Sequence, residues 1–76
     1  LDIVQIRSIS EDFELRSWHV VTGRGERVFQ TPLDAWPRRL PDGALILEDV
    51  YGDLFRVSAP EALDAQSRSL LWAFVD

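Results

Sequence analysis

Few side chains in this sequence are of types that catalyse reactions. His19 is the single histidine, and the chain has no cysteine, which excludes disulfides and thiol chemistry. A catalytic histidine needs a nucleophile and an orienting group beside it, and no Gly-x-Ser-x-Gly motif is present. We therefore expect His19 to be structural or, failing that, to make a pH-sensitive contact rather than to catalyse.

Three carboxylates, Glu48, Asp49 and Asp53, surround a predicted turn. Neighbouring strand residues point to opposite faces, so Glu48 and Asp49 do not easily converge on one ion. The segment also lacks the ligand spacing of a calcium-binding loop. Aspartates that stabilise a turn explain the cluster better, with a weak surface cation as the alternative. We predict no resident metal and no cofactor.

Gly23-Arg24-Gly25 superficially resembles a phosphate-binding loop. It lacks the Lys-Ser/Thr ending of such a loop and is not followed by a predicted helix. Glycines at a hairpin turn need no ligand to explain them. We therefore expect no ATPase activity and no enzyme.

Tryptophan and arginine supply the candidate contact residues, because these types most often anchor interfaces. Arg38-Arg39 follows Trp36-Pro37 in a long loop, although Trp36 could instead cover the open end of a sheet beside solvated arginines. Trp72 and Val75 fall off the apolar stripe of the final helix, so we expect a second copy or a neighbouring domain to bury them. The candidate partner or ligand contacts are Trp18, His19, Trp36, Arg38, Trp72 and Val75.

Three strands are predicted in the first half of the chain. Leu1–Ile9 is rich in β-branched residues, and Phe13–Val21 follows after a polar break. Glu26–Gln30 returns after a turn with two glycines. The apolar residues of the second strand change parity near Ser17, which predicts a bulge or strong twist there.

The middle of the chain contains a proline-rich loop and a second hairpin. Thr31 and Pro32 fit the N-cap and first position of a short helical turn. Ala44–Asp49 and Leu54–Ser58 alternate as strands, with Gly52 in the turn between them.

The C-terminal segment is predicted to be helical. Ser58 and Glu61 fit a capping box, although Asp64 could instead cap a second helix after a single turn at Glu61–Leu63. The residues expected to face the sheet are Leu63, Ser67, Leu70, Leu71 and Phe74.

These elements predict an α+β fold: a small antiparallel meander sheet of about five strands with a C-terminal helix packed on one face. A half-open small β-barrel is the alternative if the strand bends near Ser17. Residues 1–76 fit one small domain, and a start at Leu1 favours a C-terminal fragment of a longer chain.

Composition limits the function classes. The net charge of −5 argues against nucleic acid as a partner. The longest apolar run, Leu70–Val75, is too short for direct membrane insertion. An apolar content of 46% is sufficient for a core and argues against disorder.

Several short motifs carry a family resemblance. In order, they are Glu14–Val20, Gly23–Gly25, Leu40–Gly43, Asp49–Asp53 and Leu63–Arg68. Together they cover nearly the whole chain, and their order rather than any single motif makes the match specific. The sequence resembles a bacterial domain-of-unknown-function family found at the C-terminus of some ABC-transporter proteins.

This resemblance implies a cytoplasmic, non-enzymatic accessory domain, held at the inner face of the membrane through the parent protein. Such a domain would bind a small-molecule ligand, regulate, or dock on the adjoining transporter ATPase or membrane domain. Self-association is the other partner expectation, and the alternative function is a structural oligomerisation domain with no ligand. The resemblance supplies no catalytic residues.

Overall fold

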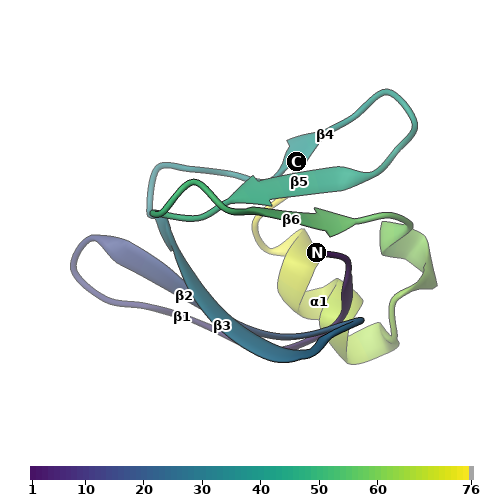
Figure 1. The fold of residues 1–76 in the computed structure, drawn as a ribbon, viewed down its shortest axis with the longest axis horizontal. Coiled ribbons are helices and arrows are strands. Elements are labelled where there is room, and N and C mark those ends of the chain that lie inside the picture. The colour runs from purple at the N-terminus through teal and green to yellow at the C-terminus, as the bar shows by residue number, and fades with distance from the viewer. Residues whose placement is uncertain (76) are drawn as a thin grey trace.

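Two three-stranded antiparallel sheets and a C-terminal helix form the fold of residues 1–75, which the computed structural model describes (Figure 1). The first sheet, in the order β1-β2-β3, contains β1 (Ile3–Glu11), β2 (Leu15–Thr22) and β3 (Gly25–Pro32). The second, in the order β4-β5-β6, contains β4 (Arg38–Arg39), β5 (Leu45–Glu48) and β6 (Leu54–Val57). The short 3₁₀ helix η1 (Pro60–Ala62) and the helix α1 (Ala65–Trp72) follow. The predicted α+β class is confirmed.

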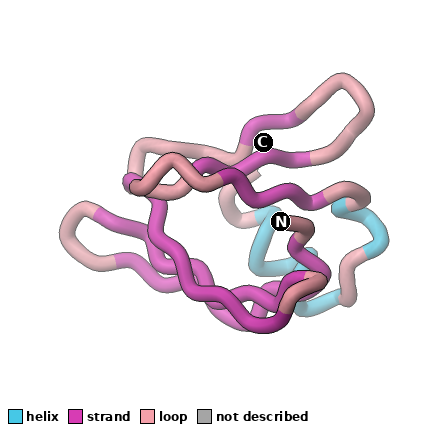
Figure 2. The backbone as a smooth tube through the Cα atoms, viewed as in Figure 1, coloured by secondary structure: helices cyan, strands magenta, loops and turns pink. Residues whose placement is uncertain are grey.

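The strands divide into two sheets instead of forming one meander, and they do not close into a barrel. The division falls where β3 ends at Pro32 and the loop with Pro37 follows; neither proline has the N–H group that would continue a strand ladder. The smooth trace in Figure 2 shows this loop carrying the chain from one layer to the other. β4, which the sequence did not predict, pairs with β5 at the far end of the loop.

The core lies between the two layers. It is made of buried apolar side chains from both sheets, among them Ile6, Trp18, Val20, Phe29, Leu45, Leu47, Phe55 and Val57. The Phe29 and Phe55 rings stack with their centroids 3.9 Å apart and so join the first sheet to the second.

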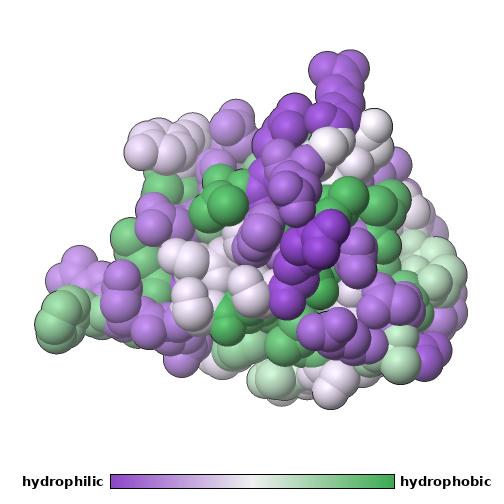
Figure 3. Space-filling view, turned by 90° about the horizontal axis from the view of Figure 1, so that it is seen from below, coloured by the Kyte–Doolittle hydropathy of each residue, from purple (hydrophilic) through white to green (hydrophobic). Residues whose placement is uncertain are grey.

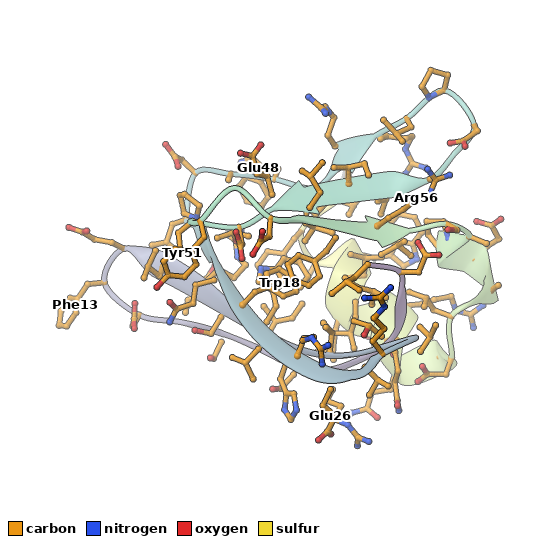
Figure 4. The ribbon with its side chains drawn as sticks, in the orientation of Figure 1. Phe13, Trp18, Glu26, Glu48, Tyr51 and Arg56 are labelled. Atoms are coloured by element: carbon orange, nitrogen blue, oxygen red, sulfur yellow. The ribbon has the colours of Figure 1, made fainter. Side chains whose placement is uncertain are left out.

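The predicted bulge near Ser17 is wrong. β2 keeps one inward face throughout, formed by Arg16, Trp18, Val20 and Thr22, and the register irregularities lie in β1. Phe13 and Leu15 suggest the parity change. Phe13 lies outside β2 at the tip of the β1–β2 hairpin, where it is 99% exposed and projects away from the molecule (Figure 4). Leu15 lies in β2 but on its outer, only partly buried face. On the inward face of β2, the first position is occupied by a charged residue, Arg16.

Both hairpin turns agree with prediction. Gly25 closes the first turn with φ of 101°, and Gly52 lies in the second with φ of 87°. Asp49 Oδ1 accepts hydrogen bonds from the N–H groups of Tyr51 (2.9 Å) and Asp53 (2.8 Å). The acidic cluster therefore includes an aspartate that stabilises its own turn, as expected.

Two predicted caps are wrong. Thr31 lies in β3 rather than at a helix start, and its Oγ1 accepts the indole N–H of Trp18 at 3.0 Å. Ala59, not Ser58, precedes η1, and it provides no side-chain cap. Sequence spacing predicts a local capping role for each hydroxyl, whereas the Thr31 hydroxyl instead bonds Trp18 on the neighbouring strand.

The alternative cap at Asp64 is confirmed. Its carboxylate accepts the N–H of Ser67 at 3.2 Å, and the Ser67 hydroxyl lies 2.5 Å from Asp64 Oδ1. The buried Ser67 Oγ also accepts the N–H of Ile6 at 2.8 Å, which ties α1 to β1. Because α1 ends at Trp72, Val75 leaves the helical spacing and packs against the core.

Candidate functional site

A buried arginine organises one end of the molecule. Arg16 is 2% exposed, and its Nη1 and Nη2 donate to the carbonyl oxygens of Ala35 (3.0 Å) and Leu33 (3.2 Å). Its Nε donates to Glu11 Oε2 at 2.9 Å, which balances the charge. A planar guanidinium can make these bonds at once, so Arg16 fixes the loop after β3 against β2.

The same guanidinium contacts two aromatic rings. Its central carbon lies 4.3 Å from the Phe74 ring centroid and 4.8 Å from that of Trp36. These distances are typical of cation–π contacts, which are stronger where water is excluded. The Arg16 guanidinium therefore supports one face of the Trp36 ring, although Trp36 is 60% exposed.

A hollow of about 380 Å³ lies next to Trp36. It is lined by Trp36, Pro37, Arg39, Phe74 and Val75. On the same side the Arg39 guanidinium stands 5.7 Å from the ring centroid of Trp72, which is 42% exposed. The loop after β3 and the end of α1 thus meet here, although they are far apart in the sequence.

Arg38 lines a second, smaller hollow that Trp36 also borders, together with Ile46 and Glu48. Residues that follow each other in a strand point to opposite faces, which separates Arg38 from Arg39. We call the group around Trp36 the Trp36–Trp72 surface; it consists of the exposed residues Trp36, Arg38, Arg39 and Trp72 and the partly buried Pro37 and Val75. It brings together four predicted contact residues: Trp36, Arg38, Trp72 and Val75.

The other two predicted contact residues lie elsewhere. Trp18 is fully buried between the sheets and stacks on Phe29 with the ring centroids 5.9 Å apart, so it belongs to the core and cannot form part of a contact surface (Figure 4). His19 is half-buried, and its Nε2 lies 3.5 Å from Glu26 Oε1. Arg7 Nε pairs with the same Glu26 oxygen at 2.9 Å.

Figure 3 shows the molecule from the side of β1–β3, where hydrophilic side chains cover much of the middle of the face. His19 thus lies beside the surface ion pair of Arg7 with Glu26. Such exposed pairs contribute little stability and are screened by salt.

The chemistry of the Trp36–Trp72 surface is that of recognition. Indole rings contact apolar groups, and guanidinium groups bind carboxylates. None of the ion pairs among residues 1–75 involves Arg38 or Arg39.

Within the same residues, no group of three or more His, Cys, Asp or Glu side chains is arranged to hold a metal ion. No helix in this described part has the length and apolarity needed to cross a bilayer.

Sequence reasoning missed the role of Arg16. The available signal was the alternation of Arg16, Trp18, Val20 and Thr22, which places the arginine in phase with the core residues of β2. A charged residue at such a position is almost never buried unless it is paired. Its partners come from a different part of the chain, which the alternation does not reveal.

Comparison with protein families gives a match over nearly the whole chain. The family is described as a domain of unknown function, DUF1854, and its model matches residues 1–74. The chain belongs to this family. The resemblance to a family of uncharacterised domains is thereby confirmed, while the link of this DUF1854 chain to ABC transporters stays a prediction. Neither the curated proteins nor the solved structures include a match to this DUF1854 sequence.

Proposed function

We propose that this DUF1854 chain is a non-enzymatic docking module whose contact surface is the Trp36–Trp72 surface. The observation that carries the proposal is the contact between the exposed indole of Trp36 and the buried guanidinium of Arg16, which holds the indole in place. Contact residues that are already ordered lose less entropy on binding. Tryptophan and arginine are also the types that most often dominate binding energy.

The charge of the surface indicates the partner. Arg38 and Arg39 lie beside two exposed tryptophans in a chain of net charge −5. A protein surface that presents carboxylates around an apolar patch complements this arrangement. Following the family resemblance, we propose that the partner is the ATPase or membrane domain of a transporter, with the chain as its cytoplasmic accessory domain.

Two further candidates use the same surface. The hollow beside Trp36 has a volume of about 380 Å³, within the range of small-molecule sites, which favours a ligand-binding role. Exposed apolar side chains such as Trp72 favour self-association, with a twofold pair as the default arrangement. The second of these is the structural oligomerisation alternative.

Photo-crosslinking in cells tests the docking proposal. A photoreactive amino acid replaces Trp36 in one variant and Phe13, an exposed residue at a hairpin tip, in a control variant. We expect crosslinks from position 36 to a transporter component and none from position 13. Crosslinks from position 36 only to a second copy would instead favour the oligomerisation function. Equal background labelling from both positions would contradict docking through this surface.

Sedimentation velocity separates self-association from docking. If the surface pairs two copies, the wild-type chain sediments as a dimer at micromolar concentration, and Trp72→Glu converts it to a monomer. A docking module remains monomeric, and Trp72→Glu then abolishes the crosslinks from position 36. A wild-type monomer whose crosslinks are unaffected by Trp72→Glu would remove Trp72 from the proposal.

A further inference from the structure

The outer edge of β3 carries unpaired backbone groups. β3 ends the first sheet, and the Val50 N–H donates to the outward-facing carbonyl oxygen of Gln30 at 2.9 Å. Backbone groups of an antiparallel strand face the same side at every second residue, so those of Val28 face outward too. No hydrogen bond among residues 1–75 engages the N–H or C=O group of Val28 on this side. This edge is thus free to pair with another strand.

β6 already pairs with a short extended segment at its own outer edge. The Arg56 N–H donates to the carbonyl oxygen of Leu1 at 2.8 Å, and the Leu1 amino group lies 3.3 Å from the Leu54 carbonyl oxygen. Asp2 and Arg56 form a parallel bridge. The space between the edges of β3 and β6 therefore holds extended backbone at one end.

A groove of about 700 Å³ continues from this point between the two edge strands. Its lining includes Phe29 and Phe55, whose rings stack, together with three exposed apolar residues, namely Val28, Tyr51 and Leu54. Val28 is 70% exposed although it lies in the middle of a strand. An exposed apolar strand edge is a liability that proteins cover or use.

The two ends of the groove differ in charge. Arg24 and Arg27 line the end at the β2–β3 turn, and Asp53 lines the end at the β5–β6 turn. None of the ion pairs among the described residues involves Arg24 or Arg27. Two arginines without a carboxylate partner, in a chain of net charge −5, indicate a ligand that supplies one.

We propose that this groove binds an extended peptide segment of a partner protein, which adds to the β3 edge as a further strand. Main-chain hydrogen bonds to Val28 supply the pairing, and apolar side chains at alternate peptide positions cover the Phe29 and Phe55 rings. Carboxylates at one end of the peptide pair with Arg24 and Arg27. The site is separate from the Trp36–Trp72 surface, so it does not depend on docking there.

Titration with synthetic peptides, followed by amide NMR spectra of the chain, tests this proposal. Two acidic probes carry a central Val-Thr-Val-Thr segment with a Glu-Glu pair at either the N-terminal or the C-terminal end, which covers both strand directions. Two control peptides carry Lys-Lys in the same places. We expect one acidic probe to shift the resonances of Arg27 and Val28 and to bind about tenfold more tightly than its lysine counterpart.

Matched variants separate strand pairing from charge. Val28→Pro removes the outward N–H without removing a bond to β2, and proline is tolerated at such an edge. Val28→Thr keeps the N–H and is its control. We expect binding of the acidic probe to be lost in Val28→Pro and retained in Val28→Thr. Arg27→Glu keeps every main-chain group of both strand edges and loses only the side-chain bonds of Arg27 to the carbonyl oxygens of Arg24 and Glu26. We expect it to abolish the preference for the acidic probe.

Three results would overturn the proposal. Equal binding of acidic and lysine probes would remove the charge argument, and equal binding to Val28→Pro and Val28→Thr would remove strand addition. A wild-type dimer that Val28→Pro converts to a monomer would assign the edge to a second copy of this chain. If Val28→Pro does not fold, as its amide spectrum would show, the comparison of Arg27→Glu with wild type decides the outcome.

Discussion

The two long sides of the layered core are closed in different ways. Away from the β3 and β6 edges, directional polar contacts connect distant segments: Ser67 joins α1 to β1, and Arg16 joins the loop after β3 to β2. Between β3 and β6 the main connection is the stacked pair Phe29 and Phe55. These two strands belong to separate sheets and do not pair with each other.

This difference indicates what each kind of contact can do in a small domain. A buried guanidinium or hydroxyl requires particular partners at particular angles, so it fixes where a loop or helix lies. Stacked rings contribute apolar burial but satisfy no backbone group. Apart from the hydrogen bond of Val50 to Gln30, the side closed by rings therefore keeps a strand edge available. A side closed by polar contacts instead presents a shaped and ordered surface.

The largest expected loss of stability comes from a substitution in the stacked ring pair between β3 and β6. Phe55→Ala removes one partner of the stack between the sheets and should destabilise the chain by about 3–5 kcal/mol, as for large-to-small changes in other cores. Urea unfolding measures this change. Tyr51→Ala, at an exposed residue of the same groove, is the control and should change stability by less than about 0.5 kcal/mol. Equal midpoints for the two variants would show that the stack does not hold this side together.

The next largest loss of stability is expected from removing the buried guanidinium of Arg16. Arg16→Leu leaves the carbonyl oxygens of Leu33 and Ala35 without their donor and should cost about 2–4 kcal/mol in the free energy of unfolding. Arg38→Leu, an exposed arginine, should cost less than about 0.5 kcal/mol. Chemical denaturation of both variants provides the measurement. A similar cost for both would mean that the buried guanidinium contributes no more than a surface charge.

A third change tests a turn that belongs to neither contact set. Gly52 has φ of 87°, which a β-branched residue strongly resists, so Gly52→Val should cost about 1–3 kcal/mol. Gly23→Ala is the matched control, because Gly23 does not have positive φ and an added methyl there meets no atom within 4 Å. An unchanged denaturant midpoint for Gly52→Val would contradict the requirement for positive φ.

The smallest effect at neutral pH concerns Asp64. Hydrogen bonds from Ser67 hold the pKa of this carboxyl below its usual range. Its contribution to stability is therefore present above the ordinary aspartate pKa and is lost as the pH falls through the lower, folded value. We expect Asp64→Asn, which can still cap a helix, to leave stability near neutral pH little changed and to flatten its decline in acid. Thermal unfolding between about pH 2 and pH 7 measures both. An unchanged acid decline would exclude Asp64 as its source.

Local patterns predicted the strands, turns and helix of this chain with few errors. Alternation located β5 and β6, glycines marked the turns, and Asp64 was among the expected caps. Each of these depends on residues within a few positions of one another, which a single sequence displays directly.

The candidate site was only partly predictable for the same reason. Trp36, Arg38 and Trp72 stood out by residue type, and the structure places them at one end of the molecule. Trp18 stood out equally and is core, because exposure depends on what the other sheet covers. Residue type therefore identifies side chains suited to contact, but not which of them reach the surface.

What the sequence determined by itself was local: element types, turn positions and the exclusion of thiol chemistry. Tertiary structure alone decided that the strands form two sheets, that Arg16 lies beneath Trp36 and that β3 keeps a free edge. Those outcomes rest on contacts between segments far apart in the chain, such as Arg16 with Phe74 and Phe29 with Phe55. Such contacts depend on the folded arrangement of both partners, and no short stretch of sequence contains it.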